Sequence, residues 1–232
     1  MTVIKLLGSC ALTLMLTSLV SSDARAGEVE VRAGSQYRVP VTSLEEARFR
    51  TVVRQKYDFS CGSAALATLL TYHYDLATPE QIAFDAMWKV GDQANIREVG
   101  FSMLDMKRYL ESIGFRADGF RIPLDQLAQV GVPAITLINT HGYNHFVVLT
   151  GIEGGRVLVA DPALGLRAIR RSEFEDKWNG ILFMIRDRVT VAQAHFNLEQ
   201  QWQVHPKAPL GAALAPEALA EFTMNLRGRW EF

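Results

Sequence analysis

The sequence predicts an α+β fold, in which helices from the N-terminal half pack on an antiparallel sheet built by the C-terminal half. Residues 61–130 contain the long segments with helical periodicity. From residue 133 onward, short runs rich in β-branched and apolar residues alternate with Gly, Asn or His. Gly154-Gly155 separates two of these runs and is typical of a hairpin turn, which joins antiparallel strands. Helices followed by strands, in that order, indicate the α+β class.

Residues 1–26 have the pattern of a secretory signal peptide. Lys5 precedes an apolar run over residues 6–20, and Ala24-Arg25-Ala26 places small residues at both positions that determine cleavage. We therefore expect cleavage after Ala26 and a periplasmic location. The apolar run has about 15 residues, fewer than the about 20 that cross a bilayer. An uncleaved anchor, or lipid attachment at Cys10, remains an alternative, although almost no apolar segment precedes Cys10.

Without the leader, about 206 residues remain, which suits one domain. Removing Lys5, Arg25 and Asp23 leaves 22 basic and 24 acidic residues, a formal charge of about −2. No basic stripe is visible, so nucleic-acid binding has little support. We divide the chain into the signal peptide, an N-terminal arm (residues 27–49), the main domain (residues 50–188) and a C-terminal extension of unassigned role (residues 189–232).

The first half of the mature chain predicts two short extended segments, at residues 28–32 and 37–41, and then helices. Ser43 followed by Glu46 is a capping-box pattern that predicts a short helix. Thr78 and Pro79 read as the N-cap and first position of another helix, and Gly114 as a helix stop. Longer helices are predicted at residues 61–74, 79–89 and 102–113, and a short helix at residues 123–129.

The second half predicts strands at residues 133–139, 146–152, 157–160, 168–170 and 181–186, with a helical turn at residues 172–178. The pattern weakens after residue 189. A terminal amphipathic helix over residues 216–226 is the one element predicted there.

Cys61 is the single cysteine of the mature chain, so it has no intramolecular partner for a disulfide. A free thiol is unusual in an oxidising compartment and indicates a reactive group. Small and apolar residues follow at 62–70, so Cys61 is expected at a helix N-terminus, where the helix dipole favours the thiolate. A buried, inert cysteine is the alternative.

A cysteine nucleophile needs a base, and the chain has five histidines. His73 is about three turns along the helix of Cys61, roughly 18 Å away, too far to act as its base. His195 and His205 lie in the polar C-terminal stretch, where no strand is predicted to hold them.

His141 and His145 precede the apolar strand Phe146-Val-Val-Leu149. His145 adjoins the strand and is favoured as the base, whereas His141 lies in a looser loop. A half-buried histidine at a strand end is the alternative. The His-x3-His spacing could also hold a metal, but no acidic residue or cysteine is arranged to complete the site, so no metal is predicted.

Two further residues complete the predicted site. Asp161 ends the strand that the Gly154-Gly155 hairpin returns beside His145, so its carboxylate could orient the imidazole. A simple Asp-Pro turn is the alternative. Gln55 precedes Cys61 by six residues, and its side-chain amide could join the Cys61 N–H in stabilising an oxyanion. A surface glutamine is the ordinary alternative for Gln55.

Gln55-x5-Cys61-Gly-x-Ala-Ala-Leu, then His145-Phe-Val-Val-Leu, then Ala160-Asp161-Pro162, resembles the C39 family of papain-like cysteine peptidases. The resemblance covers roughly residues 50–187. It implies a papain-like fold and a cysteine-type peptidase without a cofactor. It assigns Cys61 as nucleophile, His145 as general base, Asp161 as orienting carboxylate and Gln55 as oxyanion donor.

Family members joined to peptide-exporting ABC transporters cut leader peptides after Gly-Gly. This chain has no transporter segment and has Ser60 where an aspartate often precedes the cysteine. It is more similar to free-standing periplasmic members, including those of functional-amyloid secretion systems. We expect it to cleave an exported polypeptide, with Gly before the cut, and to have secretion-system or amyloid components as partners. A transglutaminase-like acyltransferase and a non-catalytic module that binds unfolded exported polypeptide are the alternatives.

Overall fold

The computed structural model describes residues 28–33, 35–40, 42–140 and 142–203. The chain divides into two compact units on either side of residue 42. In the first, β1 (Glu28–Ala33) and β2 (Ser35–Pro40) form an antiparallel hairpin, as the extended segments predicted. None of the described helices is both long and apolar enough to cross a membrane. The predicted signal peptide and the helix at residues 216–226 lie outside the described residues.

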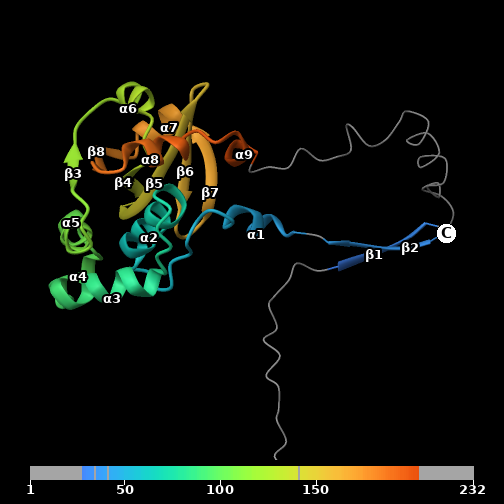
Figure 1. Cartoon of the computed structure of the whole chain (residues 1–232), viewed down its shortest axis with the longest axis horizontal. Helices are drawn as coiled ribbons and strands as arrows, with labels where there is room; N and C mark the ends of the chain where they lie inside the picture. The colour runs from blue at the N-terminus through green and yellow to red at the C-terminus, as the bar shows by residue number, and fades with distance from the viewer. Residues whose placement is uncertain (1–27, 34, 41, 141, 204–232) are drawn as a thin grey trace, which may run out of the picture. The chain divides into compact units, whose positions relative to one another are not determined.

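The second unit contains a six-stranded antiparallel sheet in the order β3-β8-β4-β5-β6-β7 (Figure 1). The sequence predicted all of its strands except the short β3, in which Asp118 and Gly119 disfavour strand formation. The α+β prediction is therefore confirmed. The strands are β3 (Ala117–Phe120), β4 (Ala134–Thr140), β5 (Tyr143–Glu153), β6 (Arg156–Asp161), β7 (Gly165–Arg170) and β8 (Trp178–Ile185).

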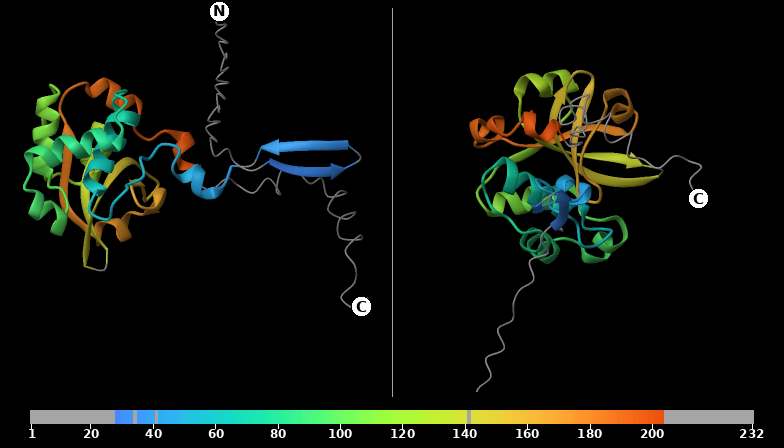
Figure 2. Two further views of the ribbon diagram at one scale, coloured as in Figure 1. Left: turned by 90° about the horizontal axis from the view of Figure 1, so that it is seen from below. Right: turned by 90° about the vertical axis from the view of Figure 1, so that its right-hand side faces the viewer.

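Helices α2 to α5 gather to one side of this sheet (Figure 2). Helix α2 packs against the central strands β4, β5 and β6, and α3 and α5 pack against α2. The helices are α1 (Leu44–Arg48), α2 (Cys61–His73), α3 (Glu80–Val90), α4 (Gln93–Val99), α5 (Met103–Ser112), α6 (Leu124–Val130), α7 (Arg171–Glu175), α8 (Val189–Ala194) and α9 (Glu199–Trp202).

Helix α2 is buried on all sides and not on a single apolar face. Every residue from 61 to 70 is buried, because the segment consists almost entirely of small and apolar side chains. The packing is close at its start: a Cβ added to Gly62 would lie 3.0 Å from both Met106 Cε and Phe101 Cβ. The core therefore fixes the end of α2 that carries Cys61.

Helix boundaries differ from the sequence prediction at α3. Pro79, and not Thr78, is the N-cap residue. The Thr78 side chain donates instead to the Leu76 carbonyl, and its N–H donates to Thr71 Oγ1, so Thr78 ties the preceding loop to α2. At α5 the Ser102 and Asp105 side chains form a capping box.

Helix α8, within the predicted C-terminal extension, packs on α2. His73 Nδ1 lies 3.2 Å from the His195 carbonyl oxygen, and His195 Nε2 lies 3.0 Å from Asp75 Oδ1. His195 is therefore held in place by α2 and the residues that follow it, which local sequence patterns did not reveal.

Candidate active site

Cys61 is the first residue of α2, is 4% exposed and forms no disulfide. Its position is set by the loop before it. Ser60 Oγ donates to Glu80 Oε1 at 2.7 Å and accepts from the Tyr57 N–H at 3.1 Å. The first N–H groups of a helix have no partner within the helix, so the Cys61 N–H is suited to bind an anionic oxygen.

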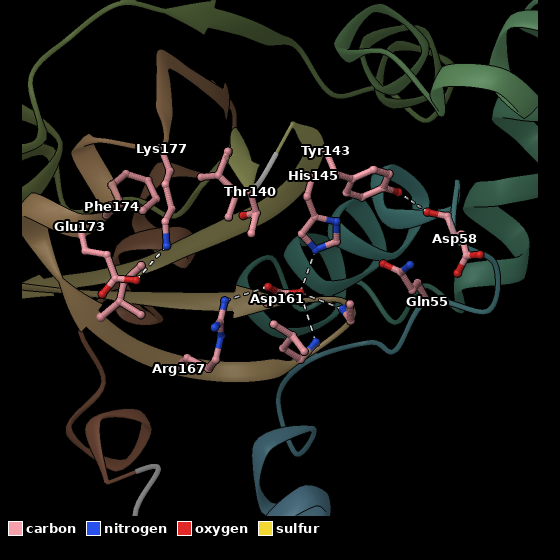
Figure 3. A pocket seen from close by; sticks show the side chains of 14 residues that line it. Gln55, Asp58, Thr140, Tyr143, His145, Asp161, Arg167, Glu173, Phe174 and Lys177 are labelled. Atoms are coloured by element: carbon pink, nitrogen blue, oxygen red, sulfur yellow. Dashed lines mark hydrogen bonds and ion pairs between the residues drawn. The ribbon is translucent and has the colours of Figure 1, made fainter.

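His145 and Asp161 meet because their strands are neighbours. The pairs Val148–Ala160 and Leu149–Val159 set the register of β5 and β6. Continuing that register places Asp161 opposite Val147, so His145 is its diagonal neighbour on the same face of the sheet. His145 Nε2 lies 2.8 Å from Asp161 Oδ1, and both side chains are buried (Figure 3).

Four donors hold the Asp161 carboxylate. Besides His145, the N–H groups of Ala163 and Leu164 donate to Oδ1 at 2.9 and 3.2 Å, and Arg167 Nη2 donates to Oδ2 at 3.0 Å. Burial alone would raise the pKa of Asp161, but these partners outweigh it and hold the pKa below its ordinary value. Asp161 is therefore a fixed negative charge beside the imidazole.

The second ring nitrogen of His145, Nδ1, is buried and has no hydrogen-bond partner among the described residues. Burial lowers the pKa of His145, but the hydrogen bond to Asp161 and the neighbouring Cys61 sulfur raise it more strongly, to about 9. At neutral pH the ring is then an imidazolium, with a proton available on the nitrogen that does not face Asp161.

Gln55 lies beside this pair. Its N–H donates to the Pro162 carbonyl at 3.1 Å, which ties the loop before α2 to the turn that follows Asp161. One hydrogen of its side-chain amide is donated to the Tyr57 carbonyl, and Nε2 carries a second. The buried Oε1 has no partner among the described residues. The Gln55 side chain lines the same cavity as His145 and Asp161 (Figure 3).

Two site residues were not anticipated from the sequence. Arg167 on β7 binds Asp161, and its position as the third residue of that strand, six residues after Asp161, gives no local signal. Tyr143 at the start of β5 donates its hydroxyl to the Asp58 carbonyl at 2.6 Å, and its ring centroid lies 6.2 Å from that of His145. This bond joins the sheet to the loop before Cys61.

The sequence also raised other histidines and a metal site as alternatives. His141 lies outside the described residues. His73 is buried on α2 against His195, at the other end of the helix from Cys61. Within the part of the chain that the structure describes, no group of three His, Cys, Asp or Glu side chains could hold a metal ion.

Two cavities adjoin the site. The larger, about 510 Å³, includes His145, Asp161, Gln55 and Arg167 in its lining. The smaller, about 280 Å³, includes Cys61 itself. Apart from Cys61, the smaller cavity is lined by Val99, Phe101, Ser102, Met103, Leu137, Asn144, Phe146 and Asn179.

A cysteine at the start of a core helix, beside a histidine and an aspartate on an antiparallel sheet, is the arrangement of papain-like peptidases. The chain belongs to the peptidase C39 family, whose model matches residues 50–190.

Two curated relatives are each named "Probable functional amyloid protease FapD". The protein from Pseudomonas aeruginosa is 45% identical over 172 residues, which cover 74% of this chain and 76% of the relative. The one from Pseudomonas fluorescens is 44% identical over 176 residues, covering 75% and 78%. Among solved structures, the peptidase domain of Streptococcus ComA, a bi-functional ABC transporter, is 18% identical with a TM-score of 0.50. The match covers 58% of this chain and 96% of that domain, and it supports the fold.

Proposed function

We propose that the protein is a cysteine peptidase that cleaves an exported polypeptide in the maturation or secretion of an extracellular assembly, with functional amyloid as the leading candidate. The observation that carries the proposal is the buried His145–Asp161 pair beside Cys61. Family membership supports peptidase activity, and the two relatives named as probable functional amyloid proteases support the choice of assembly.

The geometry supports an acyl-transfer mechanism. Cys61 attacks the carbonyl carbon of the scissile peptide bond as the thiolate, its proton being held on His145, and the negative charge moves onto the carbonyl oxygen. The Cys61 N–H and the free hydrogen of Gln55 Nε2 are the donors suited to bind that oxygen. His145, held by Asp161, gives its proton to the leaving nitrogen, and the C–N bond breaks to leave a thioester on Cys61.

Water completes the cycle. His145, now neutral, takes a proton from a water molecule, whose oxygen attacks the thioester carbonyl. The C–S bond breaks, the acyl portion leaves as a carboxylic acid, and the sulfur and the imidazolium return to their starting states. A pKa of about 9 for His145 suits the first half of this cycle, because the proton is present at neutral pH.

The proposal includes export to the periplasm through a signal peptide cut after Ala26, and a small residue, Gly, before the scissile bond. Support for export comes from the leader pattern of residues 1–26. Sequencing the amino terminus of the protein recovered from the periplasm tests this part, with Gly27 expected as the first residue.

The activity is tested by comparing new amino termini in exported proteins from cells that make the wild-type chain or Cys61→Ala. We expect specific termini that disappear with Cys61→Ala, while circular dichroism shows both proteins folded. The same termini at the same abundance with Cys61→Ala would refute the proposal. Product masses separate hydrolysis from acyl transfer, because hydrolysis adds water and a transferase adds an amine.

A further inference from the structure

The two cavities at the site are lined by different catalytic residues. In acyl transfer the acyl portion stays bonded to sulfur, while the leaving nitrogen must come within hydrogen-bond reach of the imidazole. Cys61 lines the 280 Å³ cavity, and His145 lines the 510 Å³ cavity. The larger cavity therefore lies on the side of the segment that is released with a new amino terminus.

The charged groups around the larger cavity are largely paired with one another. Arg167 binds Asp161 at 3.0 Å, and Lys177 Nζ lies 2.8 Å from Glu173 Oε1. Asp58 lies at the opposite end of the cavity from Phe174 (Figure 3). Paired charges offer little to a charged ligand, because binding one would require breaking an existing pair.

Apolar side chains supply much of the rest of the cavity lining. Phe174 is fully buried, Ile169 is partly buried and Leu164 is 50% exposed. Ile138 and Ala163 complete the apolar lining. A concave, mostly apolar site with a few polar groups is the form that binding pockets for apolar groups commonly take.

We propose that this cavity binds a large aliphatic or aromatic side chain of the substrate, within the first few residues after the cut. The inference rests on the proposed peptidase function and adds a substrate preference to it. Burying one such side chain favours cleavage by about 10- to 100-fold over alanine at the same position.

Leu164 is the residue through which this preference can be tested. Its backbone N–H, and not its side chain, donates to Asp161, so Leu164→Gln keeps the carboxylate held while it removes apolar surface from the cavity. Leu104 on α5 is 53% exposed and does not line the cavity. Leu104→Gln is therefore a matched control for the loss of one half-exposed leucine.

The experiment incubates the mature protein with a mixed pool of unfolded peptides and identifies new amino termini by mass spectrometry, with Cys61→Ala as the blank. We expect large apolar residues to be enriched at one of the first three positions after the cut. Leu164→Gln should reduce that enrichment severalfold, and Leu104→Gln should leave it unchanged.

Outcomes against the inference are distinct from those against the proposed function. Cleavage that depends on Cys61 but shows no apolar enrichment after the cut, or shows it only before the cut, would overturn the inference and leave the peptidase activity standing. An enrichment that Leu164→Gln and Leu104→Gln reduce equally would also overturn it. No termini dependent on Cys61 at all would remove the proposed function, and the inference with it.

Discussion

His145 Nε2 and Asp161 Oδ1 lie 2.8 Å apart, on adjacent strands and beneath the protein surface. The carboxylate is itself held by two backbone N–H groups and Arg167, so it presents a fixed charge to the imidazole. Against the effect of burial, this pairing and the neighbouring Cys61 sulfur raise the pKa of His145 to about 9, the value that the proposed mechanism uses. The pairing also couples the protonation of the site to the stability of the fold.

The first prediction concerns the alkaline side of the pH profile. Peptidase activity should fall as the pH rises through about 9, because His145 then loses the proton that it gives to the leaving nitrogen. Asp161→Asn removes the carboxylate charge, so the alkaline limb of kcat/KM should move to lower pH. The rate itself should fall roughly 10²- to 10⁴-fold.

The control for that series is Asp118→Asn. Asp118 lies on β3, away from the site, and its carboxylate is paired with Lys107 and Arg186. This variant should leave the alkaline limb of kcat/KM in place.

The stability of the fold should depend on the same His145 proton. The pKa of His145 is raised above its ordinary value of 6.5, so its contribution to the free energy of unfolding is complete below pH 6.5. That contribution is lost as the pH rises through about 9. In the activity measurements, an alkaline limb of kcat/KM that Asp161→Asn does not move would contradict the role given to the His145–Asp161 pair.

The second prediction separates oxyanion binding from thiol reactivity. Gln55→Ala should lower kcat by about 10²- to 10³-fold, the usual cost of losing one oxyanion donor. Alkylation of Cys61 by a small reagent should proceed at the wild-type rate, because no oxyanion forms in that reaction. Gln93→Ala, at an exposed glutamine on α4, is the control. An equal fall in both rates would mean that Gln55 shapes the loop and does not bind the oxyanion.

The proximity of these residues could be predicted where the signal is local. Gly154-Gly155 is a local signal for the hairpin that returns β6 beside β5. The turn alone does not place Asp161 on the face of His145, because that also depends on a register shift between Leu149 and Gly151, which the sequence did not predict. Gln55 and Cys61 are only six residues apart. Their chemical roles rest on the family resemblance and on the experiments above, because a pattern of residue types does not reveal a rate.

Contacts between distant segments could not be predicted. The bond from Tyr143 to Asp58 spans 85 residues, and that from His73 to His195 spans 122. Each depends on how the sheet, α2 and α8 pack together, and no spacing in the sequence records it. The order β3-β8-β4 in the sheet is nonlocal for the same reason.

The third prediction concerns the turn that carries Asp161. Gly165 has φ of +78°, and a Cβ there would lie 2.6 Å from Arg48 Cβ and 2.9 Å from the Arg48 carbonyl oxygen. Gly165→Ala should lower the free energy of unfolding by about 2–4 kcal/mol, through backbone strain and displacement of α1. Urea unfolding measures the change.

Gly155→Ala is the matched control for Gly165. Gly155 has a similar φ of +73°, but a Cβ there meets nothing within 4 Å. This variant should show only the strain of the left-handed conformation, about 1 kcal/mol. The excess cost of Gly165→Ala then measures the contact with Arg48, and equal costs for the two variants would show that the contact is unimportant.

The fourth prediction concerns the acid side of stability. Burial lowers the pKa of His73 to about 4, although its hydrogen bond to the His195 carbonyl opposes that shift. The folded state therefore resists taking up a proton that the unfolded chain binds at pH 6.5 and below. His73 contributes no such penalty above pH 6.5, and stability is lost progressively as the pH falls from 6.5 toward 4, by at most about 3 kcal/mol.

Urea midpoints between pH 7 and pH 4 test this for the wild-type protein and His73→Gln. The variant should be less stable at pH 7, because it disturbs the contact between α2 and α8, but its stability should decline less as the pH falls. Because only the difference in slope between the two proteins is attributed to His73, the carboxylates that titrate near pH 4 cancel in the comparison. Identical slopes would show that His73 takes up its proton equally well in the folded and unfolded chain.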